Sequence, residues 1–135
     1  MIEFETEDPL VQETQKHGTI DRDSMHKTFL EHDWRGLYEK MQGSESSETF
    51  HSPSIYFKDK ENHIEICFSL LDISTDLEFL VFFSRQKNVR GFLGFGSKIQ
   101  RVTSDLSGIS AEACQAILSD FINVDLEALE KKFIV

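Results

Sequence analysis

The sequence contains little of what marks several common protein classes. Only two cysteines and two prolines occur among the 135 residues. Cys67 and Cys114 lack the spacing of a metal or redox motif, and two cysteines are too few for a disulfide framework. The longest apolar run, Leu77 to Phe83, is interrupted by Glu78 and is far shorter than the roughly 20 residues that span a bilayer. We therefore expect neither a disulfide-rich protein nor a transmembrane helix.

Signals for export and for metal binding are also missing. The first ten residues, MIEFETEDPL, carry acids where a secretory signal has a basic segment followed by an apolar one. The five histidines, at positions 17, 26, 32, 51 and 63, never lie two or four residues apart, so no zinc-binding helix motif is present. We expect a cytoplasmic protein with no metal and no other cofactor.

The composition is that of a folded globular chain. Hydrophobic residues make up 39% and charged residues 28%, and twelve residues are phenylalanine. A chain of this length is in the usual size range of one domain and can bury a core without disulfide or metal crosslinks. We expect residues 1–135 to form a single domain with a core rich in phenylalanine.

Positive charge is scarce, and the formal net charge is −10 with a pI near 4.9. Residues 1–50 hold twelve acids against five Lys and Arg, whereas residues 51–135 hold twelve against nine. A negative protein repels nucleic acid and anionic lipid and favours a basic partner. We therefore expect a protein partner, with no nucleic acid and no membrane.

The apolar pattern predicts an α+β fold: an N-terminal helix, an antiparallel sheet of about four strands, and C-terminal helices packed on one face. Residues 1–20 carry five acids without a sustained periodicity, so we expect an irregular or frayed N-terminal segment. From about Asp23 to Met41, apolar residues recur at separations of three to five, which predicts one helix. Gly36 weakens the middle of this helix.

Four strands are predicted in the middle of the chain. Residues 55–57 begin the first, and residues 64–70 alternate apolar and polar side chains, as in a strand with one buried face. The nearly continuous apolar run at 77–85 predicts a central strand covered on both faces. Residues 86–91 form a turn, and residues 92–103 return as the fourth strand.

Two helices are predicted at the C-terminal side. Ser110 is placed to cap the first of them, because a serine oxygen can accept a bond from a free backbone N–H of the first turn. The tripeptide at 123–125 breaks this helix. Residues 126–133 form the last amphipathic helix, with Lys131 and Lys132 near its C-terminal end, where cations are favourable.

The stretch RGFLGFGSK, residues 90–98, has three glycines followed by a serine and a lysine. A phosphate-binding loop requires the order Gly, Lys, then Ser or Thr, and it joins a strand to the start of a helix. Here Ser97 precedes Lys98, and a strand pattern continues after them. We interpret Gly94 and Gly96 as positions where a bulky neighbour or another backbone approaches closely.

Three chemically reactive side chains alternate along one predicted strand. His63, Glu65 and Cys67 would project from the face opposite the buried row. Such a set can serve a nucleophile and its base, or a metal, but residues two apart on a strand stand roughly 7 Å apart. We favour a solvated face over a catalytic site.

Between Arg85 and Arg101 the sequence has five basic residues and no acid. The five are Arg85, Lys87, Arg90, Lys98 and Arg101. The segment can bind an anion or an acidic partner, or it can be a hairpin whose charges keep a sheet edge soluble. The sequence favours neither interpretation.

Acids in the first part of the chain are the candidate partner-binding residues. They are Glu31, Asp33, Glu39, Glu45 and Glu48, which follow the acids of the N-terminal segment. Clustered carboxylates accelerate encounter with a basic protein and add specificity. The alternative is a solubilising surface with no partner.

In size, acidity and α/β order the chain resembles the immunity proteins that bacteria encode beside polymorphic or contact-dependent growth inhibition toxins. The resemblance includes the strand pairs with charged turns in SPSIYFKDKENHIEI and LEFLVFFSRQKNVRGFLGF. It implies a stoichiometric inhibitor without activity of its own, which covers the active site of one cognate toxin. The charge implies that this toxin is basic, such as a nuclease.

Two other classes stay open. A small acidic secretion chaperone would bind an effector segment as a dimer, and it would need an exposed apolar surface that some of the phenylalanines could supply. A small enzyme would use the face with His63, Glu65 and Cys67. Between oligomeric states, we favour a monomer.

Overall fold

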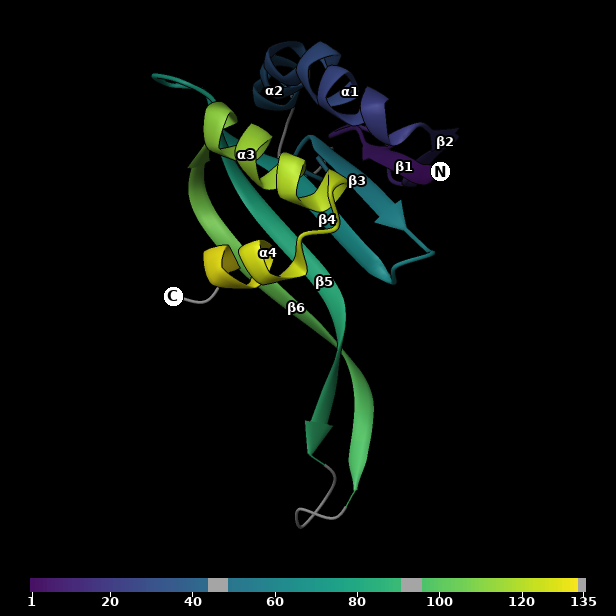
Figure 1. The fold of residues 1–135 in the computed structure, drawn as a ribbon. Coiled ribbons are helices and arrows are strands. Elements are labelled where there is room, and N and C mark those ends of the chain that lie inside the picture. Colours follow the sequence, from purple (N-terminus) through teal and green to yellow (C-terminus); the bar gives the residue numbers. More distant parts are fainter. Residues whose placement is uncertain (44–48, 91–95, 134–135) are drawn as a thin grey trace.

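The computed structural model describes the whole chain except residues 44–48, 91–95 and 134–135. In this part of the chain six strands form one antiparallel sheet in the order β2-β1-β3-β4-β5-β6. The strands are β1 Ile2–Glu7, β2 Gln15–Ile20, β3 Ser54–Asp59, β4 Ile64–Asp72, β5 Glu78–Arg90 and β6 Ser97–Ser110. The helices are η1 Arg22–Ser24, α1 Met25–Glu31, α2 Trp34–Gln42, α3 Ala111–Ile122 and α4 Leu126–Phe133. The helices pack on one face of the sheet (Figure 1).

The predicted fold class is confirmed, but the sheet is larger than the predicted four strands. The expectation of an irregular segment over residues 1–20 is wrong, because β1 and β2 lie there and β1 pairs with both β2 and β3. The three glutamates of β1 have partners on β3 or just beyond it, and Glu7 accepts a hydrogen bond from the Tyr56 hydroxyl. Glu5 pairs with Lys58 at 2.7 Å, and Glu3 pairs with Lys60 at 3.2 Å. The acids that obscured the strand pattern are therefore one polar row of a strand whose register with β3 is continuous, although its register with β2 shifts between Glu3 and Glu5.

The single predicted N-terminal helix is two helices that meet at His32 and Asp33. The Asp33 side chain caps α2 by accepting a bond from the Gly36 backbone N–H at 3.1 Å. A Cβ atom at Gly36 would lie 2.1 Å from an Asp33 carboxylate oxygen. With the Asp33 carboxylate in this position the cap favours glycine at residue 36, which lies in the first turn of α2 and not in the middle of a longer helix.

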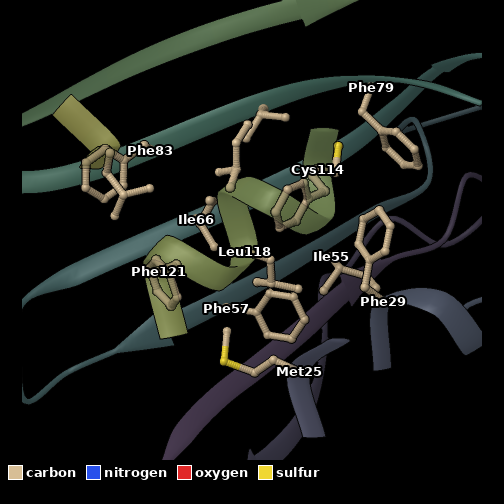
Figure 2. Packing of buried hydrophobic residues seen from close by; sticks show 14 of the residues in the cluster. Met25, Phe29, Ile55, Phe57, Ile66, Phe79, Phe83, Cys114, Leu118 and Phe121 are labelled. Atoms are coloured by element: carbon tan, nitrogen blue, oxygen red, sulfur yellow. The ribbon is translucent and has the colours of Figure 1, made fainter. Parts of the chain in front are cut away.

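The core is rich in phenylalanine, as predicted, and lies between the sheet and the helices (Figure 2). The fully buried phenylalanines are Phe29, Phe57, Phe68, Phe79, Phe83 and Phe121. The predicted alternation in β4 is confirmed by buried Ile64, Ile66 and Phe68. The prediction that β5 is covered on both faces is wrong. Phe79, Val81 and Phe83 are buried under the helices, but Phe82 points to the face that carries no helix and is only partly buried.

The predicted C-terminal helices are confirmed. The Ser110 hydroxyl caps α3 by accepting a bond from the Ala113 N–H at 3.1 Å. The helix ends at Asn123, and Val124 has a φ of +53°, with bonds from the Val124 and Asp125 N–H groups back to α3 carbonyls. This is the hydrogen-bond pattern that a glycine usually completes, and it turns the chain into α4.

The last two strands extend beyond the rest of the sheet as a two-stranded arm (Figure 1). The last pair between β4 and β5 is Glu65 with Ser84. From Arg85 to Arg90, β5 pairs only with residues 97–102 of β6. The predicted turn at 86–91 is therefore wrong, because β5 continues to Arg90. The prediction for Gly94 lies outside the described residues. The predicted close approach at Gly96 is wrong, because no atom of the described residues beyond its chain neighbours lies within 4 Å of the position a Cβ would take there. Its φ of +68° is a conformation that glycine adopts easily.

Candidate functional site

Carboxylates gather at the end of the molecule opposite the arm. The β4–β5 turn, the start of α3 and the junction of α1 with α2 lie there (Figure 1). Asp72 is paired with Glu78 across strands, and Glu78 with Ser110, which precedes α3. The Trp34 ring, next to Asp33, lies 4.9 Å from the Phe79 ring, next to Glu78. We call this set the acidic end, and its members are Glu31, Asp33, Asp72, Asp76, Glu78 and Glu112.

Few cations oppose these carboxylates. The sequence has no Lys or Arg from Glu61 to Ser84, nor from Val102 to Glu130, and the cations nearest in sequence to Glu31 and Asp33 are Lys27 and Arg35. In the described part of the chain the one ion pair at the acidic end joins Glu31 to Lys27 at 3.9 Å, and both side chains are exposed. Such a pair is worth little in water. The acidic end thus presents charge that the fold itself does not neutralise.

Backbone and hydroxyl groups keep the Asp72 carboxylate ionised. The Ser74 hydroxyl donates to it at 2.7 Å, and the N–H groups of Ile73 and Ser74 donate at 2.8 and 3.1 Å. These bonds hold the pKa of Asp72 below its ordinary value, and the bond from the Ser74 hydroxyl contributes most. Glu112 lies in the first turn of α3, where the helix dipole favours an anion.

The structure places three of the five predicted partner-binding residues. Glu31 and Asp33 lie at the acidic end, and Glu39 lies exposed on α2. Glu45 and Glu48 lie outside the described residues. Sequence reasoning missed the other acids of the acidic end, because the basic segment lowers the net charge of the second half of the chain. They are Asp72, Asp76, Glu78 and Glu112.

His63, Glu65 and Cys67 do not form one row. His63 precedes β4, in a turn where its φ is +55°. It lines a shallow hollow of about 350 Å³ with Lys58 and Arg101. Cys67 lines a different hollow of about 290 Å³ with Tyr56 and Phe82. Although Glu65 borders both hollows, the Cys67 thiol lines one and the His63 imidazole lines the other.

The Cys67 side chain is buried between its neighbours although its face of the sheet carries no helix. Burial raises the pKa of this thiol to about 12, and a thiol is a poor nucleophile. Burial also raises the pKa of Tyr56, whose hydroxyl donates a hydrogen bond to Glu7. Neither group supplies an anion at neutral pH that could attack a substrate.

A third hollow, of about 280 Å³, lies between β1, β2 and α2. His17 stacks on Phe4 with ring centroids 4.8 Å apart, and it forms a 2.6 Å hydrogen bond with the Thr6 hydroxyl. Burial lowers the pKa of His32, so the imidazole is held neutral. Among the described residues, no group of three or more His, Cys, Asp and Glu is arranged to hold a metal ion.

The basic segment is largely occupied by the protein's own acids. Arg85 is buried and donates to both carboxylate oxygens of Glu130, at 2.6 and 3.1 Å. Lys87 pairs with the same carboxylate at 2.9 Å, and Arg101 pairs with Glu65 at 3.2 Å. Three of the five cations are thus part of the fold, and nothing is described of the Arg90 and Lys98 side chains.

No known protein family, curated protein or solved structure matches this chain. Within the described residues, every helix is too short or too polar to cross a bilayer.

Proposed function

We propose that this protein is a cytoplasmic immunity protein that binds one cognate basic toxin and neutralises it by covering its active site. The observation that carries this proposal is the acidic end, where six carboxylates outnumber the neighbouring cations Lys27 and Arg35 and only one exposed ion pair is formed among the described residues. A basic nuclease surface is shaped to hold phosphates. Carboxylates at similar spacing can take their place and bring the two proteins together quickly.

The state of the reactive side chains supports a role in binding. The Cys67 thiol is neutral, and it lines a different hollow from His63. A binding protein needs no activated nucleophile. It needs a rigid surface, and the acidic end rests on the buried contacts of Phe79 with Phe29 and Trp34.

The first experiment is capture of partners by the tagged protein from the cells that make it, at low and at high salt. We expect one basic protein at near-equal stoichiometry, released as the salt concentration rises. This partner should be toxic when expressed alone and harmless when expressed together with the chain. A partner that is not toxic would contradict the proposal.

The second experiment assigns the surface with isosteric neutralisations. One variant combines Asp76→Asn, Glu78→Gln and Glu112→Gln. A second combines the predicted residues Glu31→Gln, Asp33→Asn and Glu39→Gln, and the asparagine at 33 retains the oxygen that caps α2. The control combines Asp21→Asn, Asp23→Asn and Glu61→Gln, which remove the same charge away from the acidic end.

Each of the first two variants should weaken binding of the toxin by about tenfold or more and reduce its salt dependence, whereas the control should bind nearly as the parent does. Equal weakening in all three would mean that only total charge matters and would contradict a defined binding surface. A secretion chaperone would need an exposed apolar surface. Leu30 and Leu71 are exposed next to Glu31 and Asp72, and Ile99 is exposed on the arm, so capture of a secreted effector would favour the chaperone over the immunity protein.

A further inference from the structure

The strand β6 forms one edge of the sheet over its whole length. In the described residues it pairs with β5 alone, from Ser97 to Ser110. Its outer backbone N–H and C=O groups therefore have no strand beside them. Such an edge is a template for pairing with another chain unless it is blocked. Here the pairing register shifts only near Leu106 to Ile109, where Gly108 has a φ of +69°.

The side chains of β6 form a pattern that is complementary to itself. Arg101, Thr103 and Asp105 lie on the face without helices, and all three are exposed. The Asp105 carboxylate makes no hydrogen bond or ion pair with another described side chain, and the residue is paired across strands with Phe82. An antiparallel pairing of two β6 strands around Thr103 would place Arg101 of each chain opposite Asp105 of the other.

We propose that two copies of this chain form a two-fold symmetric dimer through β6, in the register that pairs Thr103 with Thr103. The interface then uses one surface twice, and it contains two Arg101 to Asp105 ion pairs between the chains. Opposite charges directly across two strands stabilise their pairing. Arg101 keeps its bond to Glu65, because a guanidinium has five N–H donors. The dimer differs from the monomer that the sequence favours.

The same register accounts for the arm. A hairpin of two strands is marginally stable in water, and both edges of the arm are unpaired. In the dimer, residues 99–102 of one chain lie against residues 104–107 of the other. The arm of each copy thus gains a third strand from the body of its partner. This pairing stops short of Gly108, where the strand is irregular.

Charge reversal tests the register. In the variant Arg101→Asp, residue 101 would face Asp105 of the other copy, and in Asp105→Arg, residue 105 would face Arg101. Analytical ultracentrifugation should find a dimer for the parent protein. Each single variant should have a dissociation constant at least about tenfold higher, because two attractive pairs become repulsive. Far-UV circular dichroism and denaturant unfolding check that each variant is folded.

Two rescues separate this interface from a general loss of stability. Mixing the two single variants should give a heterodimer, since both of its ion pairs are then between opposite charges. The double variant Arg101→Asp with Asp105→Arg should also dimerise as the parent does. Every chain that carries Arg101→Asp still lacks the bond to Glu65 in both rescues, so its recovery cannot come from repair of the monomer.

Hydrogen exchange supplies an independent readout. Outward-facing backbone amides between Ile99 and Ser107 should exchange more slowly as the protein concentration rises, while amides of the other edge strand, β2, should not change. A parent protein that is monomeric at all concentrations would overturn the proposal. So would a dimer that both single variants leave intact, or a mixture of the two that stays monomeric.

Discussion

The two ends of the β5–β6 ribbon carry opposite charge, and the fold treats these charges differently. At the acidic end, carboxylates face solvent above a closely packed aromatic core formed by Phe29, Trp34 and Phe79. At the root of the arm, Arg85 and Lys87 are held by one carboxylate of α4. The number of charges in a segment therefore does not reveal which charges are available to a partner. Their pairing within the fold decides that.

The largest difference between the two ends should be in packing. Phe79→Ala removes a fully buried ring whose centroid lies 5.3 Å from that of Phe29 and 4.9 Å from that of Trp34. We expect a loss of about 3–5 kcal/mol in the free energy of unfolding, because the cavity at this site is lined by rings that cannot close it. Denaturant unfolding measures this loss.

The matched change at the other end is Ile99→Ala, which alters a side chain that is 66% exposed. Measured at a dilution where the chain is monomeric, it should change the free energy of unfolding by less than about 0.5 kcal/mol. Similar losses in both variants would contradict the contrast between an anchored end and a projecting arm.

A smaller effect is expected at the root of the arm. Glu130→Ala removes the carboxylate that pairs with Arg85 and leaves a buried guanidinium without its counter-ion. We expect a loss of about 2–3 kcal/mol in unfolding free energy, since a buried charge without a partner is costly. The control is Glu127→Ala on the same helix, where the pair with Lys131 is exposed and should contribute almost nothing.

The Glu130 contribution should depend on pH. Although burial acts to raise its pKa, the hydrogen bonds from Arg85 and Lys87 hold the pKa of Glu130 below its ordinary value. A lowered pKa stabilises the fold fully above the ordinary value and loses its effect as the pH falls through the lowered one. The parent and Glu130→Ala should therefore converge in unfolding free energy in acid, and a difference independent of pH would contradict this ion pair.

Much of the fold follows from local sequence pattern. The alternation in residues 64–70 and the cap at Ser110 are local signals, and both are confirmed. Apolar and acidic residues also alternate in β1. In the sequence these glutamates are typical of a solvated segment, because their partners Lys58 and Lys60 lie far along the chain. The break between α1 and α2 lies at His32 and Asp33. It could not be predicted, because the helical spacing of apolar residues continues across these two positions.

The candidate site is less accessible from sequence. Glu31 and Asp33 could be found from the charge of the first fifty residues. Glu78 and Glu112 join them only because β5 pairs with β6 and Phe79 contacts Trp34. Ion pairs within the fold have the opposite effect on the basic segment. Glu130, which is distant in sequence, pairs with Arg85 and Lys87, so these two cations are not available to a partner. Tertiary contacts thus decide which charges form a surface.

An effect smaller than those of Phe79→Ala and Glu130→Ala separates structure from recognition at the acidic end itself. Ser110→Ala removes the oxygen that accepts the Ala113 N–H at 3.1 Å and should cost about 1 kcal/mol of unfolding free energy. Ser110→Asp retains a capping oxygen but places a carboxylate across the strands from Glu78, so its stability should lie between those of Ser110→Ala and the parent. If the acidic end binds a basic protein, Ser110→Asp should bind that protein more tightly, while folded Ser110→Ala should bind it as the parent does. Titration calorimetry with the captured partner measures both affinities. If Ser110→Asp does not bind more tightly, or if the only change is weaker binding by Ser110→Ala, the start of α3 supports this end of the fold without taking part in recognition.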